Sequence, residues 1–327
     1  SYLQFLALNK IYKNVDIIVP QKSFFFPYIT KKIFIHISPK IHEPILNHYI
    51  LSRVKKNYDL IFVKSGEFVG KKLILQLKKR TKKIVFNCND NPFVSRDKNR
   101  WKLFLPACKY YDLIAFQDQS RIAPSKRFGV KKTLIVLPAY QKNIHCPQKI
   151  SSREKKKYNN DVIFIGTWHP ERGIFFKKLI DMGLNLKIYG NGWEKDANYR
   201  FLQSKIVLGQ VNHPLYSKLI QCAKIALCQL SKGNLDSITK RSVEIPAIGT
   251  LLCAPRTKAH KNVFIENKEA IFFGNVNECF RKCKSLLSNI NKINKISYSG
   301  HIKVTKILKQ DNEAMVKKIV SKVLEDM

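Results

Sequence analysis

The stretch VIFIGTWHPERG, residues 162–173, decides the fold. An apolar run ends at Gly166, and a turn that contains a histidine, a glutamate and an arginine precedes a second apolar segment. The unbroken run is typical of a strand covered on both faces, and Pro170 is favoured in a first helical turn. We therefore expect a strand, a sharp turn and a helix whose N–H groups, with Arg172 beside them, form an anion site. A capped helix with surface charges is the alternative interpretation.

The same pattern recurs along the chain. Short apolar runs alternate with helical segments, which predicts parallel sheets with right-handed crossovers. The expected strands are 15–19, 33–37, 59–63, 83–87, 112–116 and 133–137, followed by 161–165, 185–189, 205–208, 224–229, 250–253 and 270–273. The expected helices include 2–13, 67–79, 174–182, 213–222, 276–288 and 301–325.

The segment 140–160 separates the two series of strands. It has no hydrophobic periodicity and is crowded with Ser, Pro, Asn and Lys, which is typical of a linker between domains. We expect two doubly wound α/β domains, and the helix at 2–13 in place of an opening strand is consistent with the loss of a strand upstream of Ser1. The predicted boundaries are 1–145 for the first domain, 146–160 for the linker, 161–300 for the second domain and 301–327 for a C-terminal helix.

The chain is strongly basic. Its 60 Lys and Arg against 23 Asp and Glu give a formal net charge of +37. Such a field attracts nucleic acid, acidic membrane leaflets or phosphorylated substrates. An AT-rich genome, which enriches Lys, Asn and Ile together, explains the charge equally well. The sequence has no RNA-recognition, helix-turn-helix or zinc-finger signature, so we do not expect nucleic acid as a partner.

The eight cysteines include no CxxC pair, and several lie in apolar, strand-like runs where Cys acts as a small hydrophobic residue. We therefore expect neither zinc nor disulfides and infer a reducing compartment. No apolar run reaches the roughly 18 residues that a membrane span needs, and no signal peptide is evident. These observations predict a cytoplasmic protein.

Ligands of open parallel sheets bind beyond the carboxyl ends of the strands, so the loops after strands are the candidate sites. The stretch GNLDSITKRSVEIPAIGTLLCAP, 233–255, gathers a hydroxyl, two cations and carboxylates at the start of an expected helix. This set suits a sugar diphosphate, because cations and N–H groups bind phosphates and a carboxylate binds paired ribose hydroxyls. An ion-paired helix start is the alternative.

The order of these motifs resembles a known family. FIGTWHPERG, LKIYGNGW and TKRSVEIPAIGTLLCA resemble successive signatures of the glycosyltransferase group 1 superfamily and, within it, of the CgeB-like (spore-maturation) branch. YDLIFVKSG, KIVFNCNDNP, YYDLIAFQ and LPAYQKNIHCP resemble the N-terminal half of that branch. The resemblance implies a GT-B fold, in which two Rossmann-like domains face each other across a cleft. It also implies an acceptor site mainly in the first domain, a nucleotide-sugar site mainly in the second, and a last helix that crosses back to the first.

The resemblance also implies roles for single residues. The acid–seven–acid motif of the superfamily implies that Glu244 binds the donor ribose and that Asp236, one methylene shorter than usual, stands at the first acid. The resemblance further implies that Arg172 is the cation that binds the diphosphate, with Arg241 as a second candidate. Asp90 follows a first-domain strand and is either the acceptor-side base or a turn-forming residue. The candidate catalytic residues are Asp90, His169 and Asp236, and the candidate donor-binding residues are Gly166, Thr167, Trp168, Arg172, Tyr189, Gly190, Thr239, Lys240, Arg241 and Glu244.

The resemblance implies transfer of a sugar from a nucleotide-diphosphate sugar, such as a UDP-sugar, to a cell-envelope, lipid-linked or polysaccharide acceptor. The sequence has no DxD triplet, and protein cations with helix dipoles stabilise a departing diphosphate, so we expect a metal-independent enzyme without a cofactor. The acid–seven–acid motif favours retention of the anomeric configuration. The charge adds an expected attachment to the inner face of the cytoplasmic membrane. A non-catalytic or epimerase GT-B protein, and a basic nucleic-acid-binding protein, are the alternatives.

Overall fold

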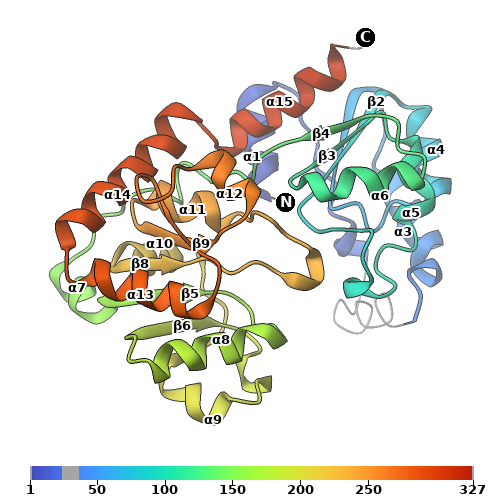
Figure 1. Cartoon of the computed structure of the whole chain (residues 1–327). Helices are drawn as coiled ribbons and strands as arrows, with labels where there is room; N and C mark the ends of the chain where they lie inside the picture. The colour runs from blue at the N-terminus through green and yellow to red at the C-terminus, as the bar shows by residue number, and fades with distance from the viewer. Residues whose placement is uncertain (1, 24–36, 326–327) are drawn as a thin grey trace. The chain divides into compact units, whose positions relative to one another are not determined.

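The computed structural model describes residues 2–23 and 37–325, which form two compact units. Unit 1 comprises Ser1–Leu137, Gly233–Leu235 and Glu313–Met327, and unit 2 comprises Pro138–Lys232 and Asp236–Asn312 (Figure 1). Each unit contains one parallel sheet with helices packed against it. Both units are therefore Rossmann-like, as the alternation of apolar runs and helical segments predicts.

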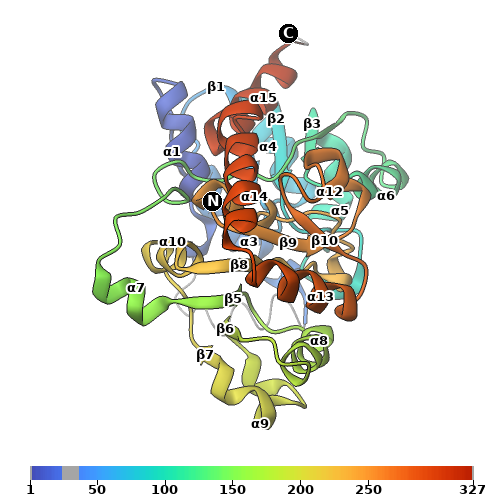
Figure 2. The ribbon, with the colours of Figure 1, turned by 60° about the vertical axis from the view of Figure 1, so that its left-hand side comes forward.

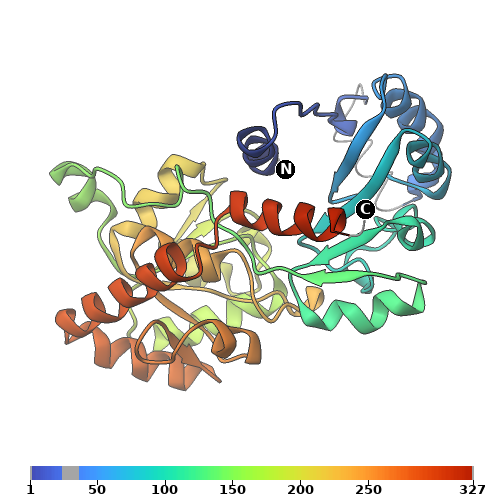
Figure 3. The same cartoon turned by 90° about the horizontal axis from the view of Figure 1, so that it is seen from above.

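The sheet of unit 1 has the strand order β1-β2-β3-β4. α15 lies beside α1, where Lys10 forms an ion pair with Glu313 at 2.9 Å (Figure 3). The strands are β1 (Tyr58–Lys64), β2 (Thr81–Cys88), β3 (Leu113–Phe116) and β4 (Thr133–Ile135). The helices are α1 (Tyr2–Ile11), α3 (Glu43–Leu51), α4 (Lys71–Lys78), α5 (Phe104–Ala107), α6 (Ile122–Arg127) and α15 (Asn312–Leu324).

The four strands predicted between residues 59 and 137 are confirmed, but the strand predicted at 15–19 is wrong. This segment has no regular structure, and Ile17 is 46% exposed. Within the described residues no strand pairs with it, so its apolar side chains are not covered as those of a sheet strand would be. The strand predicted at 33–37 lies almost entirely outside the described residues, and Ile37 is in a turn.

The sheet of unit 2 has the order β10-β9-β8-β5-β6-β7, and all its neighbouring strands are parallel (Figure 2). The chain runs from β5 to β7 in one direction and then returns to β8 on the other side of β5. The carboxyl ends of β5 and β8 therefore flank the topological switch point, where open α/β sheets bind ligands. The strands are β5 (Asn160–Ile165), β6 (Leu186–Gly190), β7 (Ile206–Leu208), β8 (Ala223–Leu227), β9 (Leu251–Pro255) and β10 (Ile271–Phe273).

The helices of unit 2 cover both faces of this sheet (Figure 1). They are α7 (Ser152–Tyr158), α8 (Pro170–Asp181), α9 (Tyr199–Leu202), α10 (His213–Gln221), α11 (Arg241–Ile248), α12 (Lys258–Val263), α13 (Val276–Leu287) and α14 (Ile290–Ile302). α7 lies within the predicted linker, where Ser151 and Glu154 form a capping box that stabilises an exposed helix.

The single helix predicted at 301–325 is wrong. α14 ends at Ile302 and a π-helical turn follows at Lys303–Ile307. Lys309 then has a φ of 47°, and Asp311 pairs with Tyr140 in an isolated bridge before α15 begins. A left-handed residue cannot continue an α-helix, so the chain changes direction between two helices.

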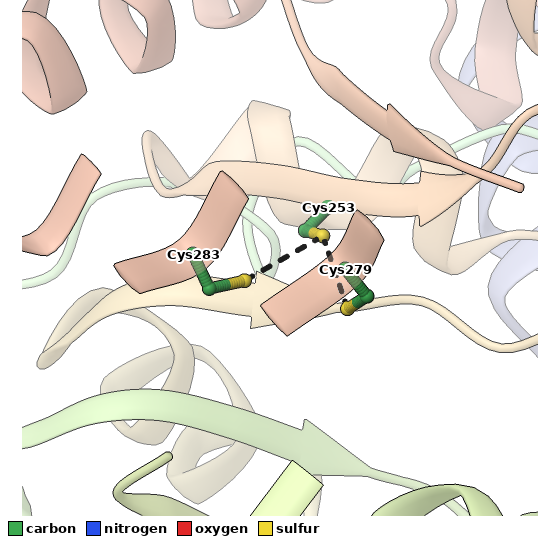
Figure 4. Close-up of side chains that lie close together, drawn as sticks. All are labelled: Cys253, Cys279 and Cys283. Carbon is green, nitrogen blue, oxygen red and sulfur yellow. Dashed lines mark hydrogen bonds between the residues drawn. The ribbon is translucent and has the colours of Figure 1, made fainter. Parts of the chain in front are cut away.

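Three cysteine side chains meet in the core between the sheet and α13 (Figure 4). The sulfur of Cys253 on β9 lies 4.0 Å from that of Cys279 and 3.9 Å from that of Cys283. All three are buried among apolar side chains, and burial raises the pKa of the Cys253 thiol well above its ordinary value. Cys253, which lies in an apolar, strand-like run, therefore packs as a small hydrophobic residue, as the sequence predicts.

Candidate functional site

The candidate site lies at the carboxyl ends of β5 and β8 in unit 2. The loop after β5 leads into α8, and the longer loop after β8 leads into α11. The N-termini of both helices, which are the positive ends of their dipoles, therefore lie near the switch point of the sheet, which favours a negatively charged ligand. Twelve of the thirteen sequence-predicted site residues belong to unit 2, and Asp90 belongs to unit 1.

Gly166 and Gly190 allow the loops after β5 and β6 to approach each other closely. The N–H of Gly166 donates to the carbonyl of Tyr189 at 2.8 Å, and Trp193 Nε1 donates to the carbonyl of Gly166 at 2.9 Å. Gly190 has a φ of 147°, and a Cβ there would lie 2.1 Å from the Gly166 oxygen. Only glycine fits this position, so Gly190 fixes the turn that carries the first half of the site.

Trp168 is held by a carboxylate that the sequence analysis did not single out. Its indole N–H donates to Asp196 Oδ2 at 2.6 Å, and Asp196 is buried. The carboxylate lies so close to α8 that a Cβ on Gly173 would approach its atoms to between 1.8 and 2.1 Å. Trp168 is thus fixed by Asp196, and Asp196 requires the glycine at 173.

Arg172 lies in the first turn of α8 and is only 5% exposed. Its guanidinium donates to the backbone carbonyls of Thr167 and Gln229, whereas its buried Nε has no hydrogen-bond partner. Its pKa falls to about 10, first because the group is buried and second because the Arg241 cation lies close by. Two neighbouring guanidiniums with one unused donor leave a site that an anion would complete.

Arg241 opens α11, and its Nε donates to the carbonyl of Ile165 at the end of β5 at 2.5 Å. This bond ties the start of α11 to the strand that precedes Arg172. Asp236, in the preceding loop, acts on Arg172 electrostatically and opposes the lowering of the arginine pKa. The structure therefore brings Arg172, Arg241 and Asp236 together.

Glu244, in the first turn of α11, contacts two side chains from other parts of unit 2. Tyr216 on α10 donates its hydroxyl to Glu244 Oε2 at 3.2 Å, and His145 Nε2 lies 3.8 Å from Oε1. Burial lowers the pKa of His145, and burial followed by the Glu244 charge raises the pKa of Tyr216 well above its ordinary value. The carboxylate of Glu244 is 14% exposed, so it lies in a largely enclosed position.

Thr239 and Lys240 precede α11. Thr239 Oγ1 lies 3.4 Å from the sulfur of Cys228, and the Thr239 N–H donates to Ser242 Oγ at 3.2 Å. Ser242 Oγ in turn lies 2.8 Å from Nε2 of His260, a fully buried histidine that the sequence analysis did not single out. Lys240 is the N-cap residue of α11 and makes no side-chain cap.

The remaining predicted residues of unit 2 surround the turn after β5 or lie on β6. Thr167 is exposed and its carbonyl accepts from Arg172. His169 is the N-cap residue of α8 and makes no side-chain cap. The carbonyl of Tyr189 accepts a hydrogen bond from the N–H of Gly166. The Tyr189 side chain lies near Tyr158, and the pKa of Tyr189 is raised first by burial and second by Tyr158.

Asp90 lies in an ion-pair network of unit 1. Its two carboxylate oxygens accept from Arg96 at 3.1 Å and from Arg100 at 2.9 Å. Asp97 pairs with both arginines, and Glu67 pairs with Arg100 at 3.2 Å. A role as general base would require Asp90 to exchange these bonds for one to a substrate hydroxyl, and that role stays a prediction.

Sequence reasoning missed Tyr216, His145, Asp196 and Gly173. His145 stands in the motif LPAYQKNIHCP, which was used only for the family resemblance, and Tyr216 lies in an expected helix. No local pattern relates either residue to Glu244, since the contacts join segments 28 and 99 positions apart in the chain. For Asp196 the only signal is the glycine at 173, which is unusual within a helix.

A comparison with protein families finds that residues 172–316 match a family model described as glycosyl transferase-like. A search of curated proteins found no significant match. The matched segment begins at Arg172, within the first turn of α8, and includes the start of α11. This part of the chain is therefore similar to glycosyltransferase-like proteins.

Solved structures similar to the whole chain have the GT-B fold. Sucrose-phosphate synthase from Thermosynechococcus elongatus has a TM-score of 0.65 at 12% identity, over 86% of this chain and 77% of that one. Anabaena HepE in complex with UDP-glucose has a TM-score of 0.63 at 12% identity, over 87% and 82%. Trehalose-6-phosphate synthase, studied for glycosyl transfer with retention, has a TM-score of 0.59 at 12% identity, over 98% and 82%. At these identities the likeness shows the fold, and this chain is a GT-B protein.

Proposed function

We propose that the protein transfers a sugar from a UDP-sugar to a cell-envelope, lipid-linked or polysaccharide acceptor without a metal ion. The observation that carries the proposal is the pair of neighbouring guanidiniums of Arg172 and Arg241, with Glu244 in the same first turn of α11 as Arg241. Such a set supplies cations for a diphosphate and a carboxylate for ribose hydroxyls. We propose that the protein belongs to the CgeB-like branch, because its sequence motifs resemble those of that branch.

The similar structures support a nucleotide-sugar donor. HepE was solved with UDP-glucose, and TarM was solved with UDP and α-GlcNAc-glycerol. In the proposed reaction the diphosphate leaves the anomeric carbon as an anion. The unused Nε–H of Arg172, the Arg241 cation and the N-terminal dipoles of α8 and α11 stabilise its charge as it develops. Because these donors are fixed before the reaction, they do not have to reorganise during it.

The other candidate residues take roles around this centre. Asp236 is close enough to Arg172 to interact with it, and we place it at the donor sugar. His169, at the start of α8, is the candidate contact or base on the same side. Asp90 is the candidate acceptor-side base in unit 1. We propose transfer with retention, in keeping with the acid–seven–acid motif.

The test combines binding and turnover with nucleotide sugars. We expect UDP-glucose or another UDP-sugar to raise the melting temperature, because a ligand of the native state stabilises it. Glu244→Ala and Arg172→Ala should each remove this shift and lower turnover by about two orders of magnitude or more. Lys178→Ala, on an exposed position of α8, should change neither quantity.

Two further measurements complete the experiment. Circular dichroism of Arg172→Ala, together with the milder Arg172→Lys, separates loss of the site from loss of the fold. Near-normal turnover in both alanine variants would contradict the site assignment. NMR of the product gives its anomeric configuration, and an isomerised donor in place of a new glycoside would indicate an epimerase.

A further inference from the structure

Glu244 is enclosed by two side chains that reach it from separate segments of unit 2. The Tyr216 hydroxyl donates to Oε2 at 3.2 Å, and His145 Nε2 lies 3.8 Å from Oε1. The rings of His145 and Tyr216 also pack edge to face, with centroids 5.7 Å apart and planes at 71°. Each carboxylate oxygen therefore has its own neighbour, which limits the rotation of the Glu244 side chain.

The hydrogen bonds of His145 determine which ring nitrogen carries the proton. Nδ1 accepts from the backbone N–H of Gln141 at 3.0 Å, so in the neutral ring the proton is on Nε2. This N–H is on the side of the Glu244 carboxylate. The histidine is 3% exposed and burial lowers its pKa, so the neutral form with this single tautomer is the one that faces Glu244.

The segment that carries His145 is itself anchored. Ser217, next to Tyr216 on α10, donates its hydroxyl to the carbonyl of Ile144 at 2.6 Å. Asn312 donates its side-chain amide to Gln141 Oε1 at 3.0 Å. The segments that carry Tyr216 and His145 are therefore joined by a hydrogen bond between their neighbouring residues as well as by the contact between the two rings.

We propose that Tyr216 and His145 are positioning residues that hold the Glu244 carboxylate in the orientation that accepts the two ribose hydroxyls of the donor. This inference rests on the proposed function, because the ribose role of Glu244 is part of it. A carboxylate whose rotamer is already fixed loses less conformational freedom when it binds, so the support increases the preference for a ribose that bears both hydroxyls. Neither residue touches the ligand.

The test measures how strongly the protein prefers a nucleoside diphosphate over its 2′,3′-dideoxy analogue. Isothermal titration calorimetry with the UDP, ADP and GDP pairs gives the ratio of the two dissociation constants. We expect a ratio of about ten or more for the wild-type protein with the base that it accepts, because the dideoxy analogue lacks the partners of a charged carboxylate. Tyr216→Phe and His145→Leu should reduce this ratio to about three or less, while the affinity for the dideoxy analogue stays within about twofold.

Two matched variants serve as controls. Tyr199→Phe removes a tyrosine hydroxyl elsewhere in unit 2 and should leave the ratio unchanged. His145→Gln keeps an N–H group that can reach Glu244 and should retain more of the ratio than His145→Leu. A higher ratio of dissociation constants in His145→Gln than in His145→Leu would show that the N–H, and not only the volume of the ring, orients the carboxylate.

The possible outcomes distinguish a failure of the positioning role from a failure of the proposed function. An unchanged ratio in both Tyr216→Phe and His145→Leu would overturn the positioning role, and so would an equal loss of affinity for both ligands. A wild-type ratio near one, unaltered by Glu244→Gln, would overturn the ribose role of Glu244 and with it the inference. Absence of binding in all three pairs would overturn the proposed donor class.

Discussion

His260 is a fully buried histidine whose two ring nitrogens both have partners. Nδ1 lies 2.8 Å from the carbonyl of Pro255, so it carries the proton, and Nε2 accepts from Ser242 at 2.8 Å. Burial lowers the pKa of His260 from 6.5 to about 4. The ring is therefore neutral in the folded protein at any pH above about 4.

This histidine should make unit 2 sensitive to acid. Between about pH 6.5 and 4 the unfolded chain binds a proton at His260 and the folded chain does not, so stability falls as the pH falls through this window. The contribution is about 3 kcal/mol across the window. Urea denaturation at pH 7.5 and pH 5 should show a smaller pH effect for His260→Gln than for the wild-type protein. The exposed His48→Gln is the control, and an equal pH effect in wild type and His260→Gln would contradict the prediction.

Residue types at helix starts, together with the family resemblance, led to the predictions for Arg172, Arg241 and Glu244. Their chemistry is conspicuous, because cations and a carboxylate at helix starts suit a phosphate and a diol. Tyr216 and His145 were not predictable in the same way. A buried tyrosine and a buried histidine have many structural uses. Only the packing of α10 and of the segment around His145 against α11 shows that both residues face the same carboxylate.

At the scale of elements, α8 is fixed to the loop after β6 by a contact that leaves no room for a side chain. A Cβ on Gly173 would lie 1.8 Å from Asp196 Oδ2, and Asp196 also accepts from Trp168. Gly173→Ala should therefore displace Asp196 and release Trp168, which lowers the free energy of unfolding by about 2–4 kcal/mol and weakens donor binding.

Thermal unfolding and calorimetric titration with UDP check this prediction. Gly274→Ala is the matched control, because a Cβ there would meet its nearest neighbours at 3.4 and 3.5 Å, which is ordinary contact. Unchanged stability of Gly173→Ala would show that Asp196 can move without cost and that α8 does not depend on the contact.

Most strands were predictable because parallel strands covered on both faces appear as continuous apolar runs. The run at 15–19 has the same composition, but its side chains are not covered by a sheet, and a local pattern does not include that information. The break between α14 and α15 could not be predicted from a local sequence pattern either. It depends on the left-handed Lys309 and on the bridge of Asp311 to Tyr140, a residue far away in the chain.

At the scale of the whole molecule, the charge of +37 exceeds what a phosphate site in one unit needs. Within the described residues no helix is long and apolar enough to cross a bilayer. We propose that the excess charge attaches the protein to anionic membrane surfaces, because each Lys or Arg near such a surface contributes about 1 kcal/mol.

Vesicles that contain phosphatidylglycerol should therefore bind the protein at about 0.1 M salt and release it at about 1 M. This increase in salt shortens the Debye length from about 10 Å to about 3 Å and screens the attraction. Vesicles of phosphatidylcholine alone are the control. Binding that is absent at low salt, or that persists at high salt, would contradict an electrostatic attachment.

The fold class was predictable from the alternation of strands and helices, whereas the strand order was not. Crossover rules allow the chain to return to either side of β5 after β7, and the choice depends on which faces remain to be buried. That choice creates the switch point between β5 and β8, the two strands that lead into α8 and α11.

Unit 1 is formed by segments that are far apart in the chain, and this affects the order in which the two units are completed during translation. Its main segment ends at Leu137, yet its packing also includes Gly233–Leu235 and Glu313–Met327. A ribosome that adds about 5–20 residues per second needs about 10–40 s to travel from Leu137 to Met327. During this interval unit 1 lacks its last segment, Glu313–Met327, whereas all the segments of unit 2 are synthesised. The nascent chain therefore completes the segments of unit 2 before those of unit 1, although most of unit 1 is synthesised first.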